Sequence, residues 1–375
     1  MTTVADIIRC MEEWAPAWTA ESWDRVGLLL GDPAAPVQRA WVALELGPEL
    51  LDQALAAGVE MLLLHHPPLF KPLPDLRSDR PLVKRLLRAA SAGLALYAAH
   101  TNLDLAPGGV NDALAGRLGL VETRPLAPAR RDGLAKLVTF VPAAEREAVA
   151  RALFQAGAGR IGDYRECFFI TSGTGGYLAP PEGRPYLGRP GERSRVEEER
   201  LETVVPLARA GQVLAALHQA HPYQEPAVDL YPLDQAPAGL GLGRVGRLDR
   251  PRPGDDFLAW AARELGSQAA QVAGPLPERL ERVAVVGGSG GELLAEAAAA
   301  GAQMLITGES RYHQAEETWD RGVALVTLGH YQTEVVVVEP WARRLAGDLA
   351  RAGLDCEVKP WTGGADPWRP VLAER

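Results

Sequence analysis

Three short segments of this sequence carry residues of the kind that bind metal ions. In LLLHHPP, HTNLD and HYQTE these residues are His65 and His66, His100 and Asp104, and His330 and Glu334. A set of imidazoles and carboxylates without a thiolate suits zinc, iron, manganese or nickel rather than copper(I). The segments therefore predict a metal site assembled from distant parts of the chain.

The spacing within these segments favours joint ligation. In a regular strand His65 and His66 would point to opposite faces, but the Pro67-Pro68 pair ends the strand and allows both imidazoles to enter one cavity. If HYQTE begins a helix, His330 and Glu334 project from one face, one turn apart. A lone histidine at a strand end is more often a hydrogen-bonded structural residue, and the neighbouring carboxylates shift that balance toward a metal site.

Alternating strands and helices surround these segments. The predicted strands and helices of the first part are the strands 39–46, 60–66 and 94–100 and the helices 48–58 and 81–93. From about residue 281 the same alternation resumes with RVAVVGGSG, AQMLITG and VALVTLGH as strands. This order predicts an α/β domain with a mostly parallel sheet. Ligands bind at the carboxyl ends of such strands, where these histidines lie.

The middle of the chain follows another pattern. We expect a linker at 121–133, then strand 136–142, a helix, strand 167–173, a polar loop or hairpin tip at 173–200, and strand, helix and strand within 200–233. This order predicts a ferredoxin-like insert. The expected domains are 1–125 and 240–375, as two halves of one metal-binding α/β domain, and 130–236 as the insert.

Composition limits the classes of function. The 375 residues include 39 Lys plus Arg and 48 Asp plus Glu, a net charge of −9, which disfavours nucleic-acid binding. No apolar run approaches the roughly 20 residues of a membrane span. The charged start of the chain does not resemble a signal peptide, and we expect a cytoplasmic protein. The three cysteines lie far apart, which predicts neither disulfides nor a thiolate zinc site.

Two glycine-rich segments require separate interpretations. VAVVGGSGGELLAEA could present backbone N–H groups to a phosphate, although it lacks the Lys-Ser/Thr pair of a P-loop. GLGRVG (241–246) has the spacing G-x-G-x-x-G but does not precede a helix. We interpret it as a tight connection between insert and core.

The motifs together resemble a known family. LLLHHPPLF, HTNLD, GHYQTE and AESWDRVGLLLGD (20–32) are similar to the Nif-three-like family of dinuclear metal centre hexameric proteins, often described as GTP cyclohydrolase I type 2 homologs. HPYQEP (221–226) and GLGRVG resemble the insert of the longer bacterial members, which is similar to the PII/CutA-like ferredoxin fold. The resemblance implies a Nif-three-like α/β core built from both chain ends and interrupted by this insert.

The resemblance also implies a ligand set. Two divalent ions, bridged by a carboxylate, would be held by His65, His66, Asp104, His330 and Glu334. Glu45 and Glu309 stand where the family usually has Asp, which affects the surroundings of the ligands more than ligation itself. His100 and His313 match no ligand position, and we assign them as proton shuttles or as outer residues that hydrogen-bond to the ligands.

Several functions remain open from the sequence. Two ions about 3.5–4 Å apart can activate a bridging water, which favours a metal-dependent hydrolase of the GTP cyclohydrolase type acting on a nucleotide or other small molecule. The alternatives are a non-catalytic scaffold or sensor whose insert responds to a ligand, and nucleotide binding at the GGSGG turn. The resemblance implies a homohexamer, and we expect neither a nucleic-acid nor a membrane partner.

Overall fold

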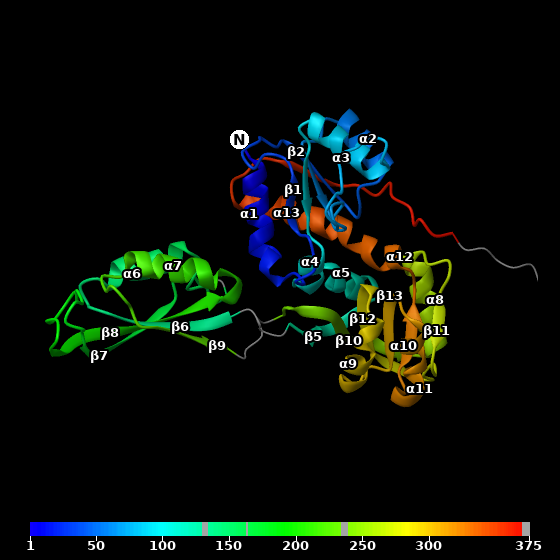
Figure 1. The fold of residues 1–375 in the computed structure, drawn as a ribbon. Helices are drawn as coiled ribbons and strands as arrows, with labels where there is room; N and C mark the ends of the chain where they lie inside the picture. Colours follow the sequence, from blue (N-terminus) through cyan, green and yellow to red (C-terminus); the bar gives the residue numbers. More distant parts are fainter. Residues whose placement is uncertain (130–133, 163, 234–238, 370–375) are drawn as a thin grey trace, which may run out of the picture. The chain divides into compact units, whose positions relative to one another are not determined.

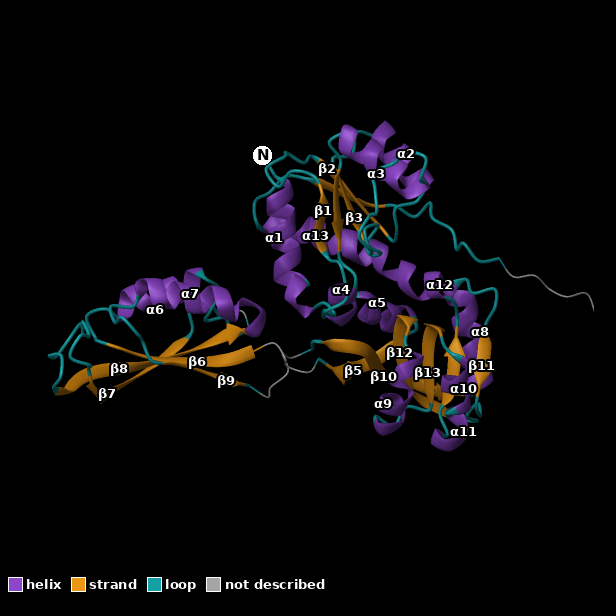
Figure 2. Cartoon of the chain, viewed as in Figure 1, coloured by secondary structure: helices purple, strands orange, loops and turns teal. Residues whose placement is uncertain are grey.

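The computed structural model describes residues 1–129, 134–162, 164–233 and 239–369. The chain divides into two compact units, which we call the core unit (Met1–Ala129 with Ala238–Arg375) and the insert unit (Arg130–Pro237). Figures 1 and 2 show the elements of each unit. No helix among the described residues is long and apolar enough to cross a membrane.

The first sheet of the core unit has the strand order β1-β4-β3-β2-β15. Its elements are β1 (Gly27–Leu30), β2 (Arg39–Ala43), β3 (Met61–Leu64), β4 (Ala95–Ala98) and β15 (Glu357–Pro360), with α1 (Val4–Trp14), α2 (Pro48–Ala56), α3 (Pro81–Ser91) and α13 (Val338–Arg351). Four strands are parallel, and β1 pairs antiparallel with β4. Every residue of β3 and β4 is buried, as expected for parallel strands covered on both faces.

The second sheet of the core unit has the order β11-β14-β13-β12-β10-β5. Its strands are β5 (Leu120–Pro128), β10 (Gly241–Arg252), β11 (Gln271–Ala273), β12 (Leu280–Ser289), β13 (Met304–Glu309) and β14 (Ala324–Thr327). The remaining core-unit helices are α4 (Thr101–Leu105), α5 (Val110–Arg117), α8 (Gly254–Leu265), α9 (Leu294–Ala299), α10 (Tyr312–Glu316), α11 (Thr318–Arg321) and α12 (His330–Glu334). In this second sheet only β12, β13 and β14 are parallel to one another. The core unit therefore contains two sheets, where the sequence predicted a single, mostly parallel one.

Two segments predicted as connections are strands of this second sheet. Residues 121–128 of the expected linker belong to β5, and GLGRVG begins β10, which pairs antiparallel with β5. Residues 130–133 of that linker lie outside the described residues. The strand β5 carries Pro125 and Pro128 and is largely exposed because it lies at the sheet edge, where proline is tolerated. The prolines and charged residues of β5 therefore gave its sequence the composition of a linker.

The insert unit confirms the predicted ferredoxin-like order of elements. These are β6 (Leu134–Val141), α6 (Arg146–Gln155), β7 (Phe168–Leu178), β8 (Arg193–Pro206), α7 (Ala210–Ala220) and β9 (Val228–Pro232). They form one antiparallel sheet in the order β7-β8-β6-β9. Figure 2 shows α6 and α7 on the same face of this sheet.

The segment predicted as a polar loop or hairpin tip at 173–200 does contain the tip of a hairpin, but its two ends, 173–178 and 193–200, belong to the strands β7 and β8. The strands β7 and β8 pair from Phe168 opposite Thr203 to Leu178 opposite Arg193, which leaves 179–192 as the connection. Because β7 is an edge strand with mostly exposed residues, its polar and glycine-rich sequence lacks the apolar alternation of a half-buried strand.

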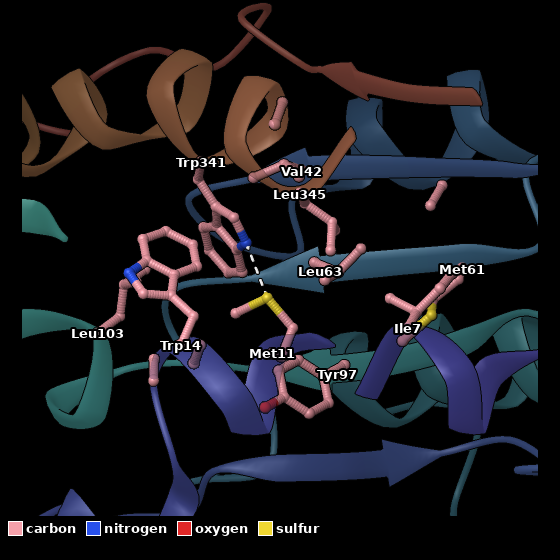
Figure 3. Packing of buried hydrophobic residues seen from close by; sticks show 14 of the residues in the cluster. Ile7, Met11, Trp14, Val42, Met61, Leu63, Tyr97, Leu103, Trp341 and Leu345 are labelled. Carbon is pink, nitrogen blue, oxygen red and sulfur yellow. Dashed lines mark hydrogen bonds between the residues drawn. The ribbon is translucent and has the colours of Figure 1, made fainter. Parts of the chain in front are cut away.

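Both ends of the chain pack on one face of the first sheet. Trp341 of α13 and Met11 of α1 have no exposed area, and the Trp341 Nε1 atom lies 3.3 Å from the Met11 sulfur (Figure 3). Val42 of β2 and Leu63 of β3 belong to the same buried cluster. The packing of these helices fixes the segment that precedes α13, which includes α12.

This packing predicts the effect of truncating Trp341. We expect Trp341→Ala to lower the free energy of unfolding by about 3–5 kcal/mol, because it leaves a cavity between α13, α1 and the sheet. Trp319→Ala is the control, since Trp319 is 76% exposed and its loss should change stability by less than about 0.5 kcal/mol. Urea unfolding measures both, and equal effects would contradict this account of the core.

Candidate metal centre

The adjacent histidines follow β3 directly. The His65 and His66 backbone N–H groups donate to Ala43 (3.2 Å) and Leu44 (2.8 Å), continuing the pairing with the segment after β2. The two imidazole centroids are 5.1 Å apart, with an angle of 39° between the rings. Both rings therefore lie in one region, although His65 is fully buried and the His66 side chain is 28% exposed.

The second group of residues comes from the other end of the chain. His330 and Glu334 lie one turn apart on α12, with 3.1 Å between His330 Nε2 and Glu334 Oε2. Gly288, at the end of β12, has a φ of +64°, and a Cβ there would lie 2.2 Å from Glu334 Oε1. Glycine at 288 therefore makes room for the carboxylate, a role that the glycine-rich sequence did not reveal.

The Glu334 carboxylate brings the two groups together. Its Oε2 atom lies 2.9 Å from His66 Nε2, and its Oε1 atom lies 3.8 Å from His65 Nε2. The His65 Nε2 atom is also 3.6 Å from Asp104 Oδ1. The structure thus brings together the five residues His65, His66, Asp104, His330 and Glu334.

Each histidine of the cluster has an oxygen partner at its other ring nitrogen. The four partners of Nδ1 are Ala99 O for His65 (2.9 Å), Glu45 for His66 (3.3 Å), Glu309 for His330 (3.3 Å) and Asp24 for His100 (2.9 Å). Such partners orient an imidazole and leave Nε2 for an ion. The Glu45 and Glu309 carboxylates thus reach the histidines.

His100 and His313, which the sequence treated alike, differ in position. His100 lies 5.2 Å from His65 between ring centroids, and its ligand atom groups with those of His65 and His66. His313 is exposed on α10 and lies outside both groups of ligand atoms found among the described residues.

Asp24 is a residue to which sequence analysis assigned no role. Its buried carboxylate accepts hydrogen bonds from the Thr101 backbone N–H (3.0 Å) and hydroxyl (2.5 Å), and it pairs with His100. Burial favours the neutral acid, but the contacts with His100 and Thr101 hold the pKa of Asp24 well below its usual range. The segment AESWDRVGLLLGD contributed to the family resemblance, but no spacing rule connects Asp24 with His100.

The phosphate role considered for the glycine-rich turn after β12 receives no support at its first two glycines. The Gly287 N–H donates to Asn111 (2.9 Å) and the Gly288 N–H donates to Thr333 (3.1 Å). Both donors are therefore used within the protein and are not available to a phosphate.

The electrostatics of the cluster favour a bound cation. Burial would lower the pKa of His66, but the Glu334 and Glu45 carboxylates raise it to about 10. Although burial opposes ionisation of Glu334, its hydrogen bonds with histidines hold its pKa well below the usual range. Burial raises the pKa of Asp104 to about 7, against the opposing effect of His65. Buried negative charge therefore lies among imidazoles that must attract a proton or a metal ion.

Two unpaired atoms show that these residues fit a metal ion. His65 Nε2 and Asp104 Oδ1 are buried and have no hydrogen-bond partner among the residues that the structure describes. Their separation of 3.6 Å is long for a hydrogen bond. It is close to the roughly 3.4 Å expected for two ligands about 2.1 Å from one tetrahedral ion. The cluster could therefore bind a metal ion, and its donor set suits zinc, iron, manganese or nickel.

The fold and the site define the class of this protein, an α/β protein with a ferredoxin-like insert and a histidine–carboxylate cluster that could bind metal. The chain belongs to the Duf34/NIF3 (NGG1p interacting factor 3) family, whose model matches residues 2–367. The family predicted from the motifs is thereby confirmed.

The relatives are similar over nearly their whole length. The chain is 37% identical over 363 residues to a protein of Halalkalibacterium halodurans, covering 96% of this chain and 97% of that protein. It is 40% identical over 373 residues to a protein of Mycobacterium tuberculosis, covering 97% and 96%. Both proteins bear the name GTP cyclohydrolase 1 type 2 homolog. The crystal structure of a Bacillus cereus protein related to NIF3 is 35% identical, covers 99% of both chains and has a TM-score of 0.76.

The raised pKa of His66 predicts proton release on metal binding. Because the metal-free site keeps His66 protonated up to about pH 10, an ion that takes Nε2 must displace this proton. We expect the apparent affinity for zinc to rise as the pH is raised toward about 10. Calorimetric titration at about pH 7.5 in two buffers of different ionisation enthalpy measures the release. His66→Gln should reduce it, and equal heats in both buffers for the parent protein would refute the prediction.

Proposed function

We propose that this protein is a metal-dependent hydrolase with a dinuclear centre bridged by Glu334. The observation that carries the proposal is the position of its two carboxylate oxygens. Glu334 Oε1 faces His65 (3.8 Å), the neighbour of Asp104, whereas Oε2 faces His66 (2.9 Å) and His330 (3.1 Å). One ion would be held by His65, Asp104 and Glu334, and the other by His66, His330 and Glu334.

The burial of these residues supports access from one side. The His65 side chain is fully buried, whereas those of His66 and His330 are 28% and 36% exposed. A small molecule can therefore approach on the side of His66 and His330. Two divalent ions bound by the cluster would supply Lewis acidity and lower the pKa of a bound water toward neutrality.

His100 and Asp24 provide the proton-handling part of the proposal. The Asp24 carboxylate fixes Nδ1 of His100 at 2.9 Å, which directs the other ring nitrogen toward the cluster. An imidazole held in this way can accept a proton from a reacting group and return it. His313, which is exposed, is retained only as a second proposed proton carrier.

The name shared by the relatives points to hydrolysis at a purine ring carbon, and we propose GTP cyclohydrolase-type chemistry as the first reaction to examine. The alternative is a non-catalytic scaffold or sensor in which the same cluster has a structural or regulatory role. The hydrolase and the scaffold would both bind metal, and only the hydrolase would turn over a substrate.

Elemental analysis of protein purified without added metal tests the dinuclear centre. We expect about two ions per chain in the parent protein, since both halves of the cluster supply ligands. His65→Ala and Glu334→Ala should lose most of this metal, whereas His218→Ala, an exposed histidine of the insert unit, should keep it. A parent protein without bound metal, or full metal content in Glu334→Ala, would contradict the proposal.

The metal-loaded protein is then tested for turnover of GTP, phosphoesters and amides. Hydrolysis that is lost in Glu334→Ala would support the enzyme. Full metal content without turnover of any of these substrates would favour the scaffold.

We further propose a domain division and a cellular compartment. The domains would be 1–125 with 240–375 as the metal-binding domain and 130–236 as the PII/CutA-like insert, which the division into core and insert units supports. The free thiols of Cys10, Cys167 and Cys356 suit a reducing compartment, and we propose that the protein is cytoplasmic.

The resemblance of the family motifs leads us to propose a homohexamer. Light scattering coupled to size-exclusion chromatography should give a mass of six chains for the metal-loaded protein. A monomer at micromolar concentration would contradict this assembly.

A further inference from the structure

The insert unit contains a cavity of about 470 Å³, and none of the residues that line it belongs to the metal cluster. Residues of the 179–192 connection, of the segment before β9 and of the sheet line it. Phe140 and Glu198 contribute from β6 and β8. Leu137 of β6 and Leu201 of β8 belong to the hydrophobic core between the sheet and the helices α6 and α7. Phe140 and Glu198 each lie three residues from one of these leucines, and successive residues of a strand point to opposite faces. The cavity therefore lies on the sheet face opposite α6 and α7.

Aromatic rings form much of its wall. The four aromatic lining residues are Phe140, Tyr177, Tyr186 and Tyr223. The Tyr186 and Tyr223 centroids are 6.2 Å apart with 48° between the rings, so these two rings are not stacked on each other. An aromatic enclosure of this kind attracts cations through the negative potential of the ring faces.

The tyrosine hydroxyl groups are already used as donors within the protein. They donate to three acceptors, which are Glu198 Oε1 for Tyr223 (2.6 Å), Glu145 Oε1 for Tyr186 (3.1 Å) and the Leu187 carbonyl for Tyr177. Burial and the Glu198 carboxylate raise the pKa of Tyr223, so that its phenol keeps the proton it donates. The phenols therefore offer a ligand ring faces and lone pairs rather than O–H donors.

The charges around the cavity also favour a cation. Three carboxylates line it, those of Glu182, Glu198 and Glu225, against the single guanidinium of Arg184. On β8, the nearby Glu199 and Glu202 pair with arginines at 3.0 and 2.6 Å. Glu198 is partly buried and has no ion pair with another described residue. Among the described residues, this carboxylate therefore has no counterion.

Gly175 of β7 allows Glu198 to lie against the strand. A Cβ at this position would be 1.9 Å from Glu198 Oε2, which no side chain could tolerate without displacing the carboxylate. Glycine at 175 thus leaves room for the acidic group, which the Tyr223 hydroxyl contacts at 2.6 Å.

We propose that this cavity of the insert unit binds an alkylammonium cation, with its charge beside the Glu198 carboxylate and its methyl or methylene groups against the tyrosine rings. The ligand supplies the positive charge that Glu198 lacks, and aromatic faces bind such ions in water. The site does not depend on the metal centre, and metal-depleted protein should bind the same cation.

The test compares choline with its uncharged isostere 3,3-dimethylbutan-1-ol, using ligand-observed NMR on the full-length protein. Choline should bind with an affinity at least about tenfold higher than the alcohol, since the two differ mainly in charge. Equal binding of the two would refute a cation site and indicate a merely apolar cavity. Preferential binding of inorganic phosphate would refute it as well.

Matched variants locate the binding. Glu198→Gln should weaken choline binding by about tenfold, whereas Glu197→Gln, at a residue that accepts from Thr174 and lies outside the cavity, should leave it unchanged. Tyr186→Leu provides a second variant, because Tyr186 is 50% exposed and its replacement should not unfold the protein. Equal affinities of Glu198→Gln and the parent protein would overturn the proposal.

Discussion

The structure depends on one buried carboxylate that lies between imidazoles from distant parts of the chain. Glu334 is 4% exposed and contacts histidines that follow β3 and β14, strands of two different sheets. A buried negative charge is costly unless positive charge or hydrogen bonds compensate it. Without metal, the imidazoles of His66 and His330 provide this compensation by holding protons, as their raised pKa values indicate. Divalent ions would compensate the charge more strongly.

The fold converges on this carboxylate from both sheets. His65, His100 and Glu45 follow parallel strands of the first sheet, whereas Gly288, Glu309 and His330 lie at the ends of the parallel strands of the second. Parallel strands place the residues that follow them at one sheet edge, where α/β proteins bind ligands. The packing of α1 and α13 on the first sheet then holds α12 in position, so stability and site geometry are linked.

The sequence was most informative where spacing alone decides geometry. The histidine pair before two prolines and the i, i+4 pair in HYQTE predicted side chains that the structure brings together. Asp24 was not assigned because its contact with His100 joins residues 76 positions apart, a relation that no local pattern contains. The edge strand β5 and the second half of β7 (174–178) were not predicted because they are exposed and lack the apolar alternation by which a half-buried strand is recognised.

Anomalous diffraction from crystals of the metal-loaded protein tests the central claim most directly. The account predicts two ions on opposite sides of the Glu334 carboxylate, one bound about 2.0–2.2 Å from His65 and Asp104 and the other at the same distance from His66 and His330. Ions that contact residues from only one end of the chain, or that lie away from Glu334, would contradict it.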